Sequence, residues 1–231
     1  MVRDAADRIR PLARWTPVMT SRSVDSRAGM EVFLKCENLQ RGGAFKIRGA
    51  SNLILSLTGD ELRKGVVAYS SGNHAQAVAI AAKHAGAKAT IVMPEDAPKA
   101  KMQPTRDLGA NVITYNRLTD DREAIAAKVM EDIGGILVPP YDHPMIIAGQ
   151  GTTALEILED VPDLDAIVVC VGGGGLVSGC ATFAREAKPD IKIFGAEPLL
   201  ANDTWQSLRK GERVTIPPPE TVADEIGRAH V

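Results

Sequence analysis

Residues 66–94 read VVAYSSGNHAQAVAIAAKHAGAKATIVMP and contain the pattern that decides the fold. VVAYSS at the start is typical of a buried strand, and ATIVMP at the end is typical of a second one. Between them, the alanine-rich stretch HAQAVAIAAKHAG predicts a helix that stops at Gly86, since glycine commonly follows the last helical residue. Two short apolar strands joined by a long helix indicate a parallel sheet.

The same alternation of strands and helices continues to the C-terminal side of this stretch. A helix predicted for residues 98–108 contains Pro104, which indicates a late start or a kink, and further strands and helices follow. These are strand NVITY, helix DREAIAAKVMED, strand GILVPP, helix GTTALEILED, strand DAIVVCV, a helix after Gly175 and strand KIFGAEP. The sequence therefore predicts an α/β fold with two open parallel sheets, divided near Tyr141.

Composition excludes several classes of protein. The chain has 231 residues, of which 45% are hydrophobic and 24% charged, with a net charge of -2. A nearly neutral chain without blocks of like charge argues against a nucleic-acid surface. The longest uncharged run, residues 166–184, contains five glycines, so we interpret it as strand, turn and helix and not as a membrane span.

The N-terminus and the cysteines predict a cytoplasmic protein. The opening MVRDAADRIR is charged from its third residue and has no apolar core of a signal peptide. Cys36, Cys170 and Cys180 show no paired or metal-like spacing, so we expect small buried residues in a reducing compartment.

A run of four glycines, Gly172 to Gly175, follows one predicted strand and precedes a helix in VVCVGGGGLVSG. Backbone N–H groups without side chains can surround an anion, and the start of a helix adds favourable partial charge. The run therefore predicts a phosphate site, although it lacks the Lys-Ser/Thr ending of an ATP loop and the spacing of a dinucleotide fingerprint. A tight packing turn is the alternative.

The segment SSGNHAQ, residues 70–76, gathers polar side chains where a strand meets a helix. In parallel sheets, ligands bind beyond the carboxyl ends of the strands. Ser70, Ser71, Asn73 and His74 at a helix N-terminus suit a carboxylate, while simple capping by Ser71 or Asn73 is the alternative.

The segment GGAFKIRGA, residues 42–50, contains one lysine, Lys46, between the apolar residues Phe45 and Ile47. The amine of Lys46 can form a Schiff base with an aldehyde, and burial beside Phe45 would lower its pKa toward reactivity. An exposed surface lysine is the ordinary alternative.

Taken together, FKIRGA, SSGNHAQ, VGGGGLVSG and GAEP resemble the motifs of the threonine/serine dehydratase and serine racemase family, in the family's order. This resemblance covers nearly the whole chain, and it implies a pyridoxal-phosphate enzyme of the tryptophan-synthase-β-like fold, type II. It further implies a large cofactor domain formed by residues 1–64 and 143–224, and a small α/β domain formed by residues 65–142. FLKCEN, PPYDHP and AGQGT are similar to the bacterial threonine dehydratase branch, which grades into hydroxyaspartate dehydratases.

The resemblance also implies roles for individual residues. Lys46 would hold pyridoxal phosphate, Phe45 would pack against its ring, and Asn73 would bond the ring's 3'-oxygen. Ser71 would act as acid and base on the face opposite the lysine. The remaining expected residues are Gly172, Gly173, Gly174, Gly175 and Leu176 for the phosphate, and Ser70, Asn73 and His74 for the substrate carboxylate.

A cation site is implied as well. Glu197, the carbonyl of Ala201 and Asp203 match the family's divalent-cation positions, and such oxygen ligands suit Mg²⁺ or Ca²⁺. Two solvated acids are the alternative.

The expected activity is that of a threonine/serine ammonia-lyase, which converts L-threonine or L-serine to a 2-oxo acid and ammonia. The alternatives are a serine racemase, a threo-3-hydroxyaspartate dehydratase, a catalytically inactive cofactor-binding fragment, or a nucleotide-binding module. Cysteine synthases fit less well, because SSGNHAQ differs from their Thr-Ser-Gly-Asn-Thr pattern. The expected partners are a small amino acid and a second copy of the chain, with no nucleic acid and no membrane.

The C-terminal end departs from the family pattern after TVAD. Members of the family run on for about ninety residues or more, as the resemblance implies, so we expect the large domain to be truncated here. Residues 225–231, EIGRAHV, match one reading frame of a sequencing adapter, and we expect them to be a non-native tail.

Overall fold

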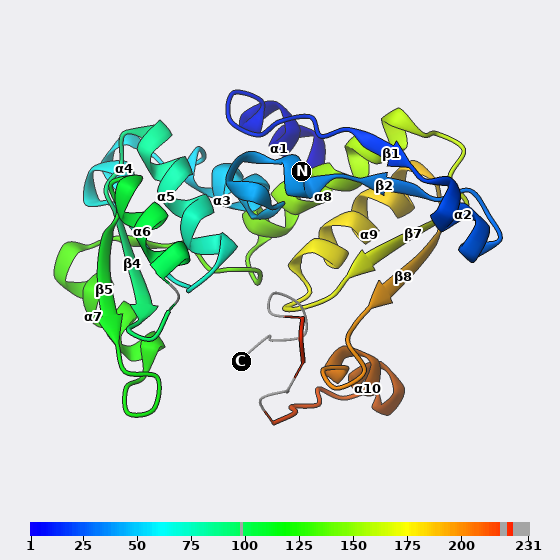
Figure 1. Ribbon diagram of the computed structural model, residues 1–231. Coiled ribbons are helices and arrows are strands. Elements are labelled where there is room, and N and C mark those ends of the chain that lie inside the picture. The colour runs from blue at the N-terminus through cyan, green and yellow to red at the C-terminus, as the bar shows by residue number, and fades with distance from the viewer. Residues whose placement is uncertain (98, 218–220, 224–231) are drawn as a thin grey trace.

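A computed structural model describes residues 1–97, 99–217 and 221–223. The predicted non-native tail, residues 225–231, lies outside the described residues. Figure 1 shows two lobes, one around β4 and β5 and the other around β7 and β8, with α3 and α8 between them. The fold is α/β with parallel sheets, as the sequence predicts.

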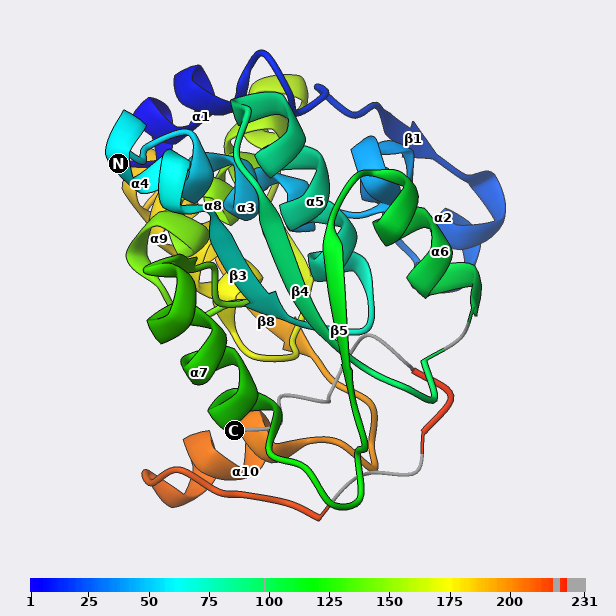
Figure 2. The same ribbon diagram turned by 90° about the vertical axis from the view of Figure 1, so that its left-hand side faces the viewer.

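The first lobe contains a four-stranded parallel sheet in the order β5-β4-β3-β6. Its elements are α4 (Gly59–Lys64), β3 (Val66–Tyr69), α5 (Asn73–Ala85), β4 (Ala89–Pro94), α6 (Lys99–Asp107), β5 (Asn111–Tyr115), α7 (Arg122–Ile133) and β6 (Ile136–Leu137). Alternate residues of a strand point to opposite faces. Accordingly, Val66 and Ala68 pack with the alanines of α5, whereas Val67 and Val92 pack against Ala126 of α7. Figure 2 shows these two helices on the two faces of the sheet.

The second lobe contains a parallel pair and an antiparallel pair of strands. Its elements are α1 (Val2–Ile9), β1 (Val18–Thr20), α2 (Arg22–Ala28), β2 (Phe33–Lys35), α8 (Pro144–Asp160), β7 (Ala166–Cys170), α9 (Gly175–Ala187), β8 (Lys192–Ala196) and α10 (Asp203–Lys210). Ile167 and Val169 of β7 pack against Phe183 of α9, which forms a second core. The boundaries of the three expected domain segments stay a prediction.

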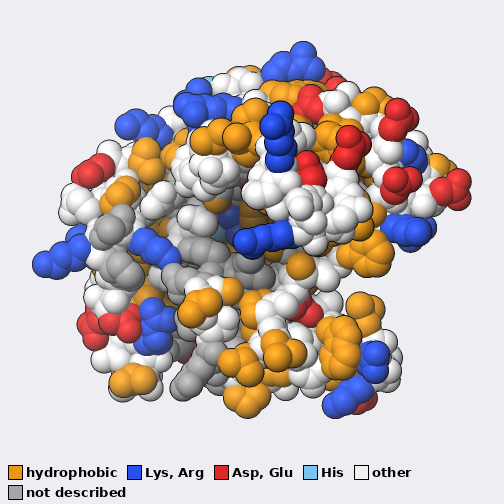
Figure 3. All heavy atoms as spheres, turned by 45° about the vertical axis from the view of Figure 1, so that its right-hand side comes forward, with side chains coloured by type: hydrophobic (Ala, Val, Ile, Leu, Met, Phe, Trp, Pro, Cys, Tyr) orange, Lys and Arg blue, Asp and Glu red, His pale blue; other side chains and the backbone are white. Residues whose placement is uncertain are grey.

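The other face of the β7–β8 pair carries exposed apolar side chains. Val168 and Phe194 are partners across the two strands, and they are 69% and 53% exposed. Leu199, Leu200, Trp205 and Leu208, in and before α10, are also exposed. Figure 3 shows hydrophobic side chains gathered on the lower part of this face of the molecule.

Helix α8 differs most from the prediction. The sequence predicts a helix from Gly151 onward, but α8 begins at Pro144, where the ring of His143 accepts a hydrogen bond from the N–H of Met145. Proline suits the first turn of a helix, because its missing N–H would have no helical partner there. The helix thus includes both glycines of AGQGT, of which only Gly151 was inside the predicted helix.

Two shorter elements bear on further predictions. Helix α6 matches the helix predicted for residues 98–108 and contains Pro104, so of the two expectations the late start is wrong; the hydroxyl of Thr105 donates a hydrogen bond to the carbonyl of Lys101 in the preceding turn. Strand β6 keeps two residues of the predicted strand GILVPP. The rest of that stretch leaves the sheet and crosses to the other lobe, where it forms one wall of the site described below.

Helix α8 lies between α3 (Lys46–Ile54) and α9 with very close backbone contacts. A Cβ atom added at Gly149 would lie 2.6 Å from the Cα of Gly49 in α3, and one at Gly151 would lie 2.8 Å from the carbonyl oxygen of Gly179 in α9. Real Cβ atoms do not approach so closely, so these glycines let three helices meet at backbone distance. Among the described residues, no helix is both long and apolar enough to cross a lipid bilayer.

Candidate active site

Lys46 is the first residue of α3, and its side chain is partly buried. The chain reaches it through two short 3-10 turns, η1 (Glu37–Leu39) and η2 (Arg41–Gly43). Every residue of α3 after Lys46 is buried, so the helix that carries the amine is packed on all sides. The Nζ atom donates a hydrogen bond of 2.8 Å to the carbonyl of Pro140, and it lies 5.4 Å from the centre of the Phe45 ring. This is the opposite of an ordinary surface lysine.

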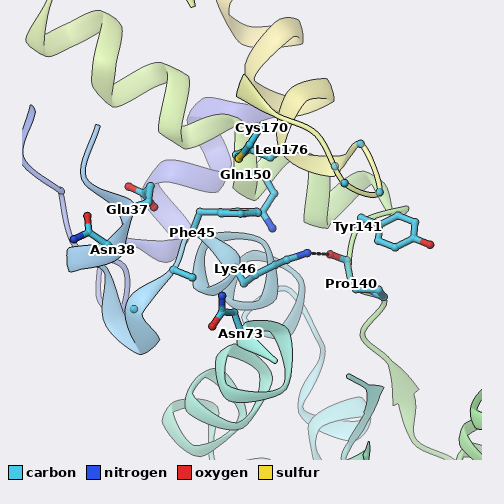
Figure 4. Close-up of a pocket in the computed structure, with 16 residues that line it drawn as sticks. Glu37, Asn38, Phe45, Lys46, Asn73, Pro140, Tyr141, Gln150, Cys170 and Leu176 are labelled. Carbon is cyan, nitrogen blue, oxygen red and sulfur yellow. Dashed lines mark hydrogen bonds between the residues drawn. The ribbon is translucent and has the colours of Figure 1, made fainter. Parts of the chain in front are cut away.

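The amine points into a cavity of about 260 Å³ between the two lobes, shown in Figure 4. That volume is close to the lower end of small-molecule pockets, which begin at about 300 Å³. The residues that line it are Glu37, Asn38, Gly43, Ala44, Phe45, Lys46, Asn73, Pro140, Tyr141, Gln150, Cys170, Gly172, Gly173, Gly174, Gly175 and Leu176. The structure thus brings together the lysine, the glycine run and Asn73, which are far apart in the sequence.

The glycine run forms the turn between β7 and α9. Gly174 has φ +82°, a left-handed conformation that favours glycine, and α9 begins at Gly175. A Cβ atom at Gly173 would collide with the ring of Tyr141, and one at Gly175 would lie 2.9 Å from the Tyr141 carbonyl oxygen. Because the first N–H groups of a helix have no partner within it, this turn suits an anion.

Only part of the segment SSGNHAQ lines the pocket. Asn73 is the first residue of α5 and lines the pocket, whereas Ser70, Ser71 and His74 are not among the lining residues. The hydroxyl of Ser70 accepts a hydrogen bond of 3.2 Å from the N–H of Gly72. The assigned roles of Ser70 and Ser71 stay predictions.

His74 is turned into the protein interior. Its Nε2 atom lies 2.8 Å from the carbonyl oxygen of Val138, and its Nδ1 atom has no hydrogen-bond partner among the described residues. Burial and, secondly, the positive charge of Lys46 lower the pKa of His74 to about 3. The ring is therefore neutral at pH 7, so any contact of this residue with a substrate carboxylate must come from its backbone N–H and not from an imidazolium charge.

The expected cation residues lie away from this pocket. Both carboxylate oxygens of Glu197 accept hydrogen bonds from α10, at 3.1 Å from the N–H of Thr204 and 2.9 Å from that of Trp205. Burial and, secondly, the charge of Glu197 raise the pKa of Asp203. Ala201 is fully buried. The first use of Glu197 is therefore as a helix cap, and the cation site stays a prediction.

Several pocket residues carried no expected role. Gln150 of α8 is 1% exposed, and its Oε1 atom accepts a hydrogen bond of 3.3 Å from the N–H of Gly49. Cys170 ends β7 at the pocket, and burial raises the pKa of its thiol. The sequence could have indicated a role for Gln150, because it is a polar residue between two glycines in AGQGT. Glu37 lies in FLKCEN, which is similar to the family, but no role was expected of it.

A two-lobed α/β fold with a lysine and a glycine-lined phosphate turn in one pocket defines a class of enzyme that uses an aldehyde cofactor. The family model described as "Pyridoxal-phosphate dependent enzyme" matches residues 9–231. The chain therefore belongs to this family of pyridoxal-phosphate dependent enzymes, and its fold is type II.

Individual relatives agree with this assignment. The chain is 51% identical over 230 residues to L-threo-3-hydroxyaspartate ammonia-lyase of Saccharomyces cerevisiae, covering 100% of this chain and 71% of that one. It is 43% identical to L-threonine ammonia-lyase of Geobacter sulfurreducens, covering 98% of this chain and 56% of the relative. The structure of maize serine racemase superposes with a TM-score of 0.96 at 45% identity, over 98% of this chain and 69% of that one.

Membership of the family implies pyridoxal phosphate as the cofactor, and the residues present fit it. Lys46 would supply an amine for its aldehyde, and the turn at Gly172–Gly175, which has no side chains and leads into the N-terminus of α9, would suit its phosphate. Phe45 and Asn73 line the space between these two features. Together these residues suit a ligand that carries an aldehyde, a phosphate group and an aromatic ring.

Proposed function

We propose that this protein is a pyridoxal-phosphate-dependent ammonia-lyase that acts on small L-amino acids with a β-hydroxyl group. One observation carries the proposal: the Lys46 amine and the four-glycine turn share a single pocket, in a chain of the pyridoxal-phosphate family. The names of the three relatives reported above, each of which contains a hydroxy amino acid, support the substrate class.

The cofactor would be held by residues of this chain that line the pocket. Lys46 would bind its aldehyde carbon, Gly172 to Gly175 with Leu176 its phosphate, and Asn73 its ring oxygen, while Phe45 packs on the ring. When bound, the cofactor supplies an electron sink that stabilises negative charge at the substrate α-carbon. Pro140 and Tyr141 form one wall of this space.

Proton movement is then assigned to Lys46. With the cofactor bound, the Nζ atom of Lys46 would take the α-proton of the substrate, and its fixed position would make it an efficient base. Loss of the α-proton and the β-hydroxyl together releases one water. Hydrolysis of the resulting enamine consumes one water and gives a 2-oxo acid and ammonia.

The substrate carboxylate would bind at the N-terminus of α5. The backbone N–H groups of Asn73 and His74, together with the hydroxyl of Ser70, are the expected donors, since helix N-termini favour anions. The neutral ring of His74 then serves to hold this turn against Val138. Tyr141, packed on the glycine turn, limits the space available to the substrate side chain.

L-serine and L-threo-3-hydroxyaspartate now have more support as substrates than L-threonine. The sequence motifs pointed first to L-threonine or L-serine, but the hydroxyaspartate enzyme is 51% identical and the threonine enzyme 43%. Comparison of kcat/KM for the three amino acids, by ammonia and 2-oxo acid release, would rank them. Highest activity on L-threonine would restore the first expectation.

Racemisation of serine is the second candidate, favoured by the superposition on maize serine racemase. In this proposal Ser71 returns a proton to the face opposite Lys46. Chiral analysis after incubation with L-serine measures racemisation. If the parent forms D-serine and the Ser71→Ala variant does not, while both still form pyruvate, the result would favour the racemase. A Mg²⁺ or Ca²⁺ ion at Glu197, Ala201 and Asp203 is proposed in addition, and activity after chelation would test it.

The decisive experiment compares the parent protein with Lys46→Ala, each mixed with pyridoxal phosphate. We expect the absorbance band of a lysine-bound cofactor in the parent alone, and a fall in activity of at least about 10³-fold, because a positioned base contributes this much. A band without 2-oxo acid production in the parent would indicate an inactive cofactor-binding fragment. Equal bands in both proteins would refute the role of Lys46.

A further inference from the structure

A buried ionic cluster lies directly behind Lys46. Arg48, two residues further along α3, has no exposed surface, and its guanidinium group is bound on both sides. It donates to the two carboxylate oxygens of Glu37 at 2.8 and 2.7 Å, and to those of Glu156 at 2.6 and 2.8 Å. A further hydrogen bond of 3.0 Å reaches the hydroxyl of Thr152. We call Glu37, Arg48, Thr152 and Glu156 the Arg48 cluster.

The cluster joins the three parts of the chain that surround the pocket. Glu37 begins η1 and itself lines the pocket, Arg48 belongs to α3, and Thr152 and Glu156 belong to α8. Paired contacts of this kind fix direction as well as distance, since the planar guanidinium group matches the geometry of a carboxylate. The relative position of α3, α8 and the η1 turn is therefore set at one side chain.

The charged groups of the cluster are paired within the protein. Lys35 donates 2.8 Å to Glu156 and 3.3 Å to Asp160, so Arg48 and Lys35 together face Glu37, Glu156 and the more exposed Asp160. Burial by itself lowers the pKa of Arg48, but the hydrogen bonds and charges of Glu37 and Glu156 outweigh this effect. The pKa is therefore raised above its ordinary value, and the guanidinium group is charged at any working pH. Buried ion pairs seldom add stability beyond apolar packing, which leaves geometry as the gain.

Helix geometry connects Arg48 to the amine. Successive residues of an α-helix are about 100° apart, so the side chains of Lys46 and Arg48 leave α3 on roughly opposite sides. Lys46 points forward into the pocket, as Figure 4 shows, while Arg48 anchors the back of the same turn. A rotation of α3 that moved Lys46 would have to break the paired contacts of Arg48.

We propose that Arg48 is a positioning residue for the reaction: its paired contacts with Glu37 and Glu156 fix the rotation of α3, and thereby hold the Lys46 amine against the cofactor. The inference rests on the proposed function, because the position matters through the bond between Lys46 and pyridoxal phosphate. Arg48 itself does not line the pocket.

The test compares two arginine-to-lysine substitutions, one within α3 and one in α1 at an arginine that contacts α3. Arg48→Lys keeps the charge but loses the paired geometry. The control Arg8→Lys alters another arginine bound to this helix, since Arg8 donates 2.5 Å to the side chain of Asn52, far along α3 from Lys46. The readouts are the dissociation constant of pyridoxal phosphate, and the fraction of Lys46 trapped by borohydride reduction and measured by peptide mass spectrometry.

We expect Arg48→Lys to bind pyridoxal phosphate at least about 10-fold more weakly and to trap less of it on Lys46, since a misplacement of about 1 Å can cost as much as 10²-fold. Arg8→Lys should stay within about 2-fold of the parent by the same reasoning. If Arg48→Lys binds and traps pyridoxal phosphate like the parent, the inference is overturned. The proposed function would still stand in that case, provided that the parent shows the absorbance band of a lysine-bound cofactor. A parent without the band would overturn both.

A milder pair of variants covers the case in which Arg48→Lys does not fold. Thr152→Val removes one acceptor of Arg48 at nearly constant volume, and Thr152→Ser restores the hydroxyl. We expect weaker cofactor binding in the valine variant and recovery in the serine variant. Valine and serine variants that both bind like the parent would count against the positioning role.

Discussion

The ring of His74 has 3% of its surface exposed, and its environment decides the charge of the residue. Burial and the neighbouring Lys46 lower its pKa to about 3, whereas an unfolded histidine titrates near 6.5. The unfolded chain therefore binds a proton at this position below pH 6.5 and the folded chain does not. The stability that His74 contributes is fully present above pH 6.5 and is lost as the pH falls toward 3.

We predict that the free energy of unfolding falls by roughly 1 kcal/mol per pH unit between pH 6 and pH 4 on account of this residue. Urea titrations at several pH values measure it. His74→Gln should flatten the profile, and the exposed His84→Gln should leave it unchanged. Equal slopes in the parent and both variants would show that another group controls this range.

At the scale of elements, the contacts of α8 with α3 and α9 set the distance between the lysine and the glycine turn. Lys46 is the first residue of α3, and the glycine run leads into α9. The positions of the lysine and of the glycine turn therefore both depend on how α3 and α9 pack against α8. Gly149 faces the backbone of Arg48 and Gly49, where an added Cβ would lie 2.5 Å from the carbonyl oxygen of Arg48. No flexible side chain is available there to move aside.

Gly149→Ala should therefore destabilise the protein by roughly 1–3 kcal/mol through overpacking, although alanine is the better helix former. It should also weaken pyridoxal-phosphate binding, since α3 must shift. Gly59→Ala is the matched control, because its nearest neighbour is the end of the Arg63 side chain at 3.5 Å. Thermal unfolding with and without cofactor measures both effects, and a Gly149→Ala variant as stable as the control would contradict this account.

At the scale of the whole molecule, apolar surface is concentrated on the outer face of the second lobe. Val168 and Phe194 lie side by side on β7 and β8 and are mostly exposed, with Leu199, Leu200, Trp205 and Leu208 also exposed nearby in the sequence. Large exposed apolar patches promote association. The expected homodimer stays a prediction, and this face is a candidate surface for self-association.

Replacement of both Val168 and Phe194 by threonine should reduce self-association, because threonine keeps the strand tendency and removes apolar surface. Light scattering over a concentration series measures it. The control is the same change at Val66 and Ile91, which are fully buried in the other sheet and should lower stability instead. Unchanged scattering in the exposed double variant would show that this face does not drive association.

The sequence by itself determined the α/β class, the parallel sheet around residues 66–94, and the family, because these follow from local periodicity and from contiguous motifs. Local signals do not report packing between distant elements. The predicted helix therefore began at Gly151, although α8 begins at Pro144 and also includes Gly149, which admits the backbone of α3.

Only the tertiary structure decided which polar residues share a pocket. It placed Asn73 and Gln150 at the cavity, turned the ring of His74 into the core, and buried Arg48 between two carboxylates. The physical reason is that burial and pairing depend on segments about a hundred residues apart, as from Arg48 to Glu156, which are 108 positions apart. No pattern within a short stretch of sequence contains that information.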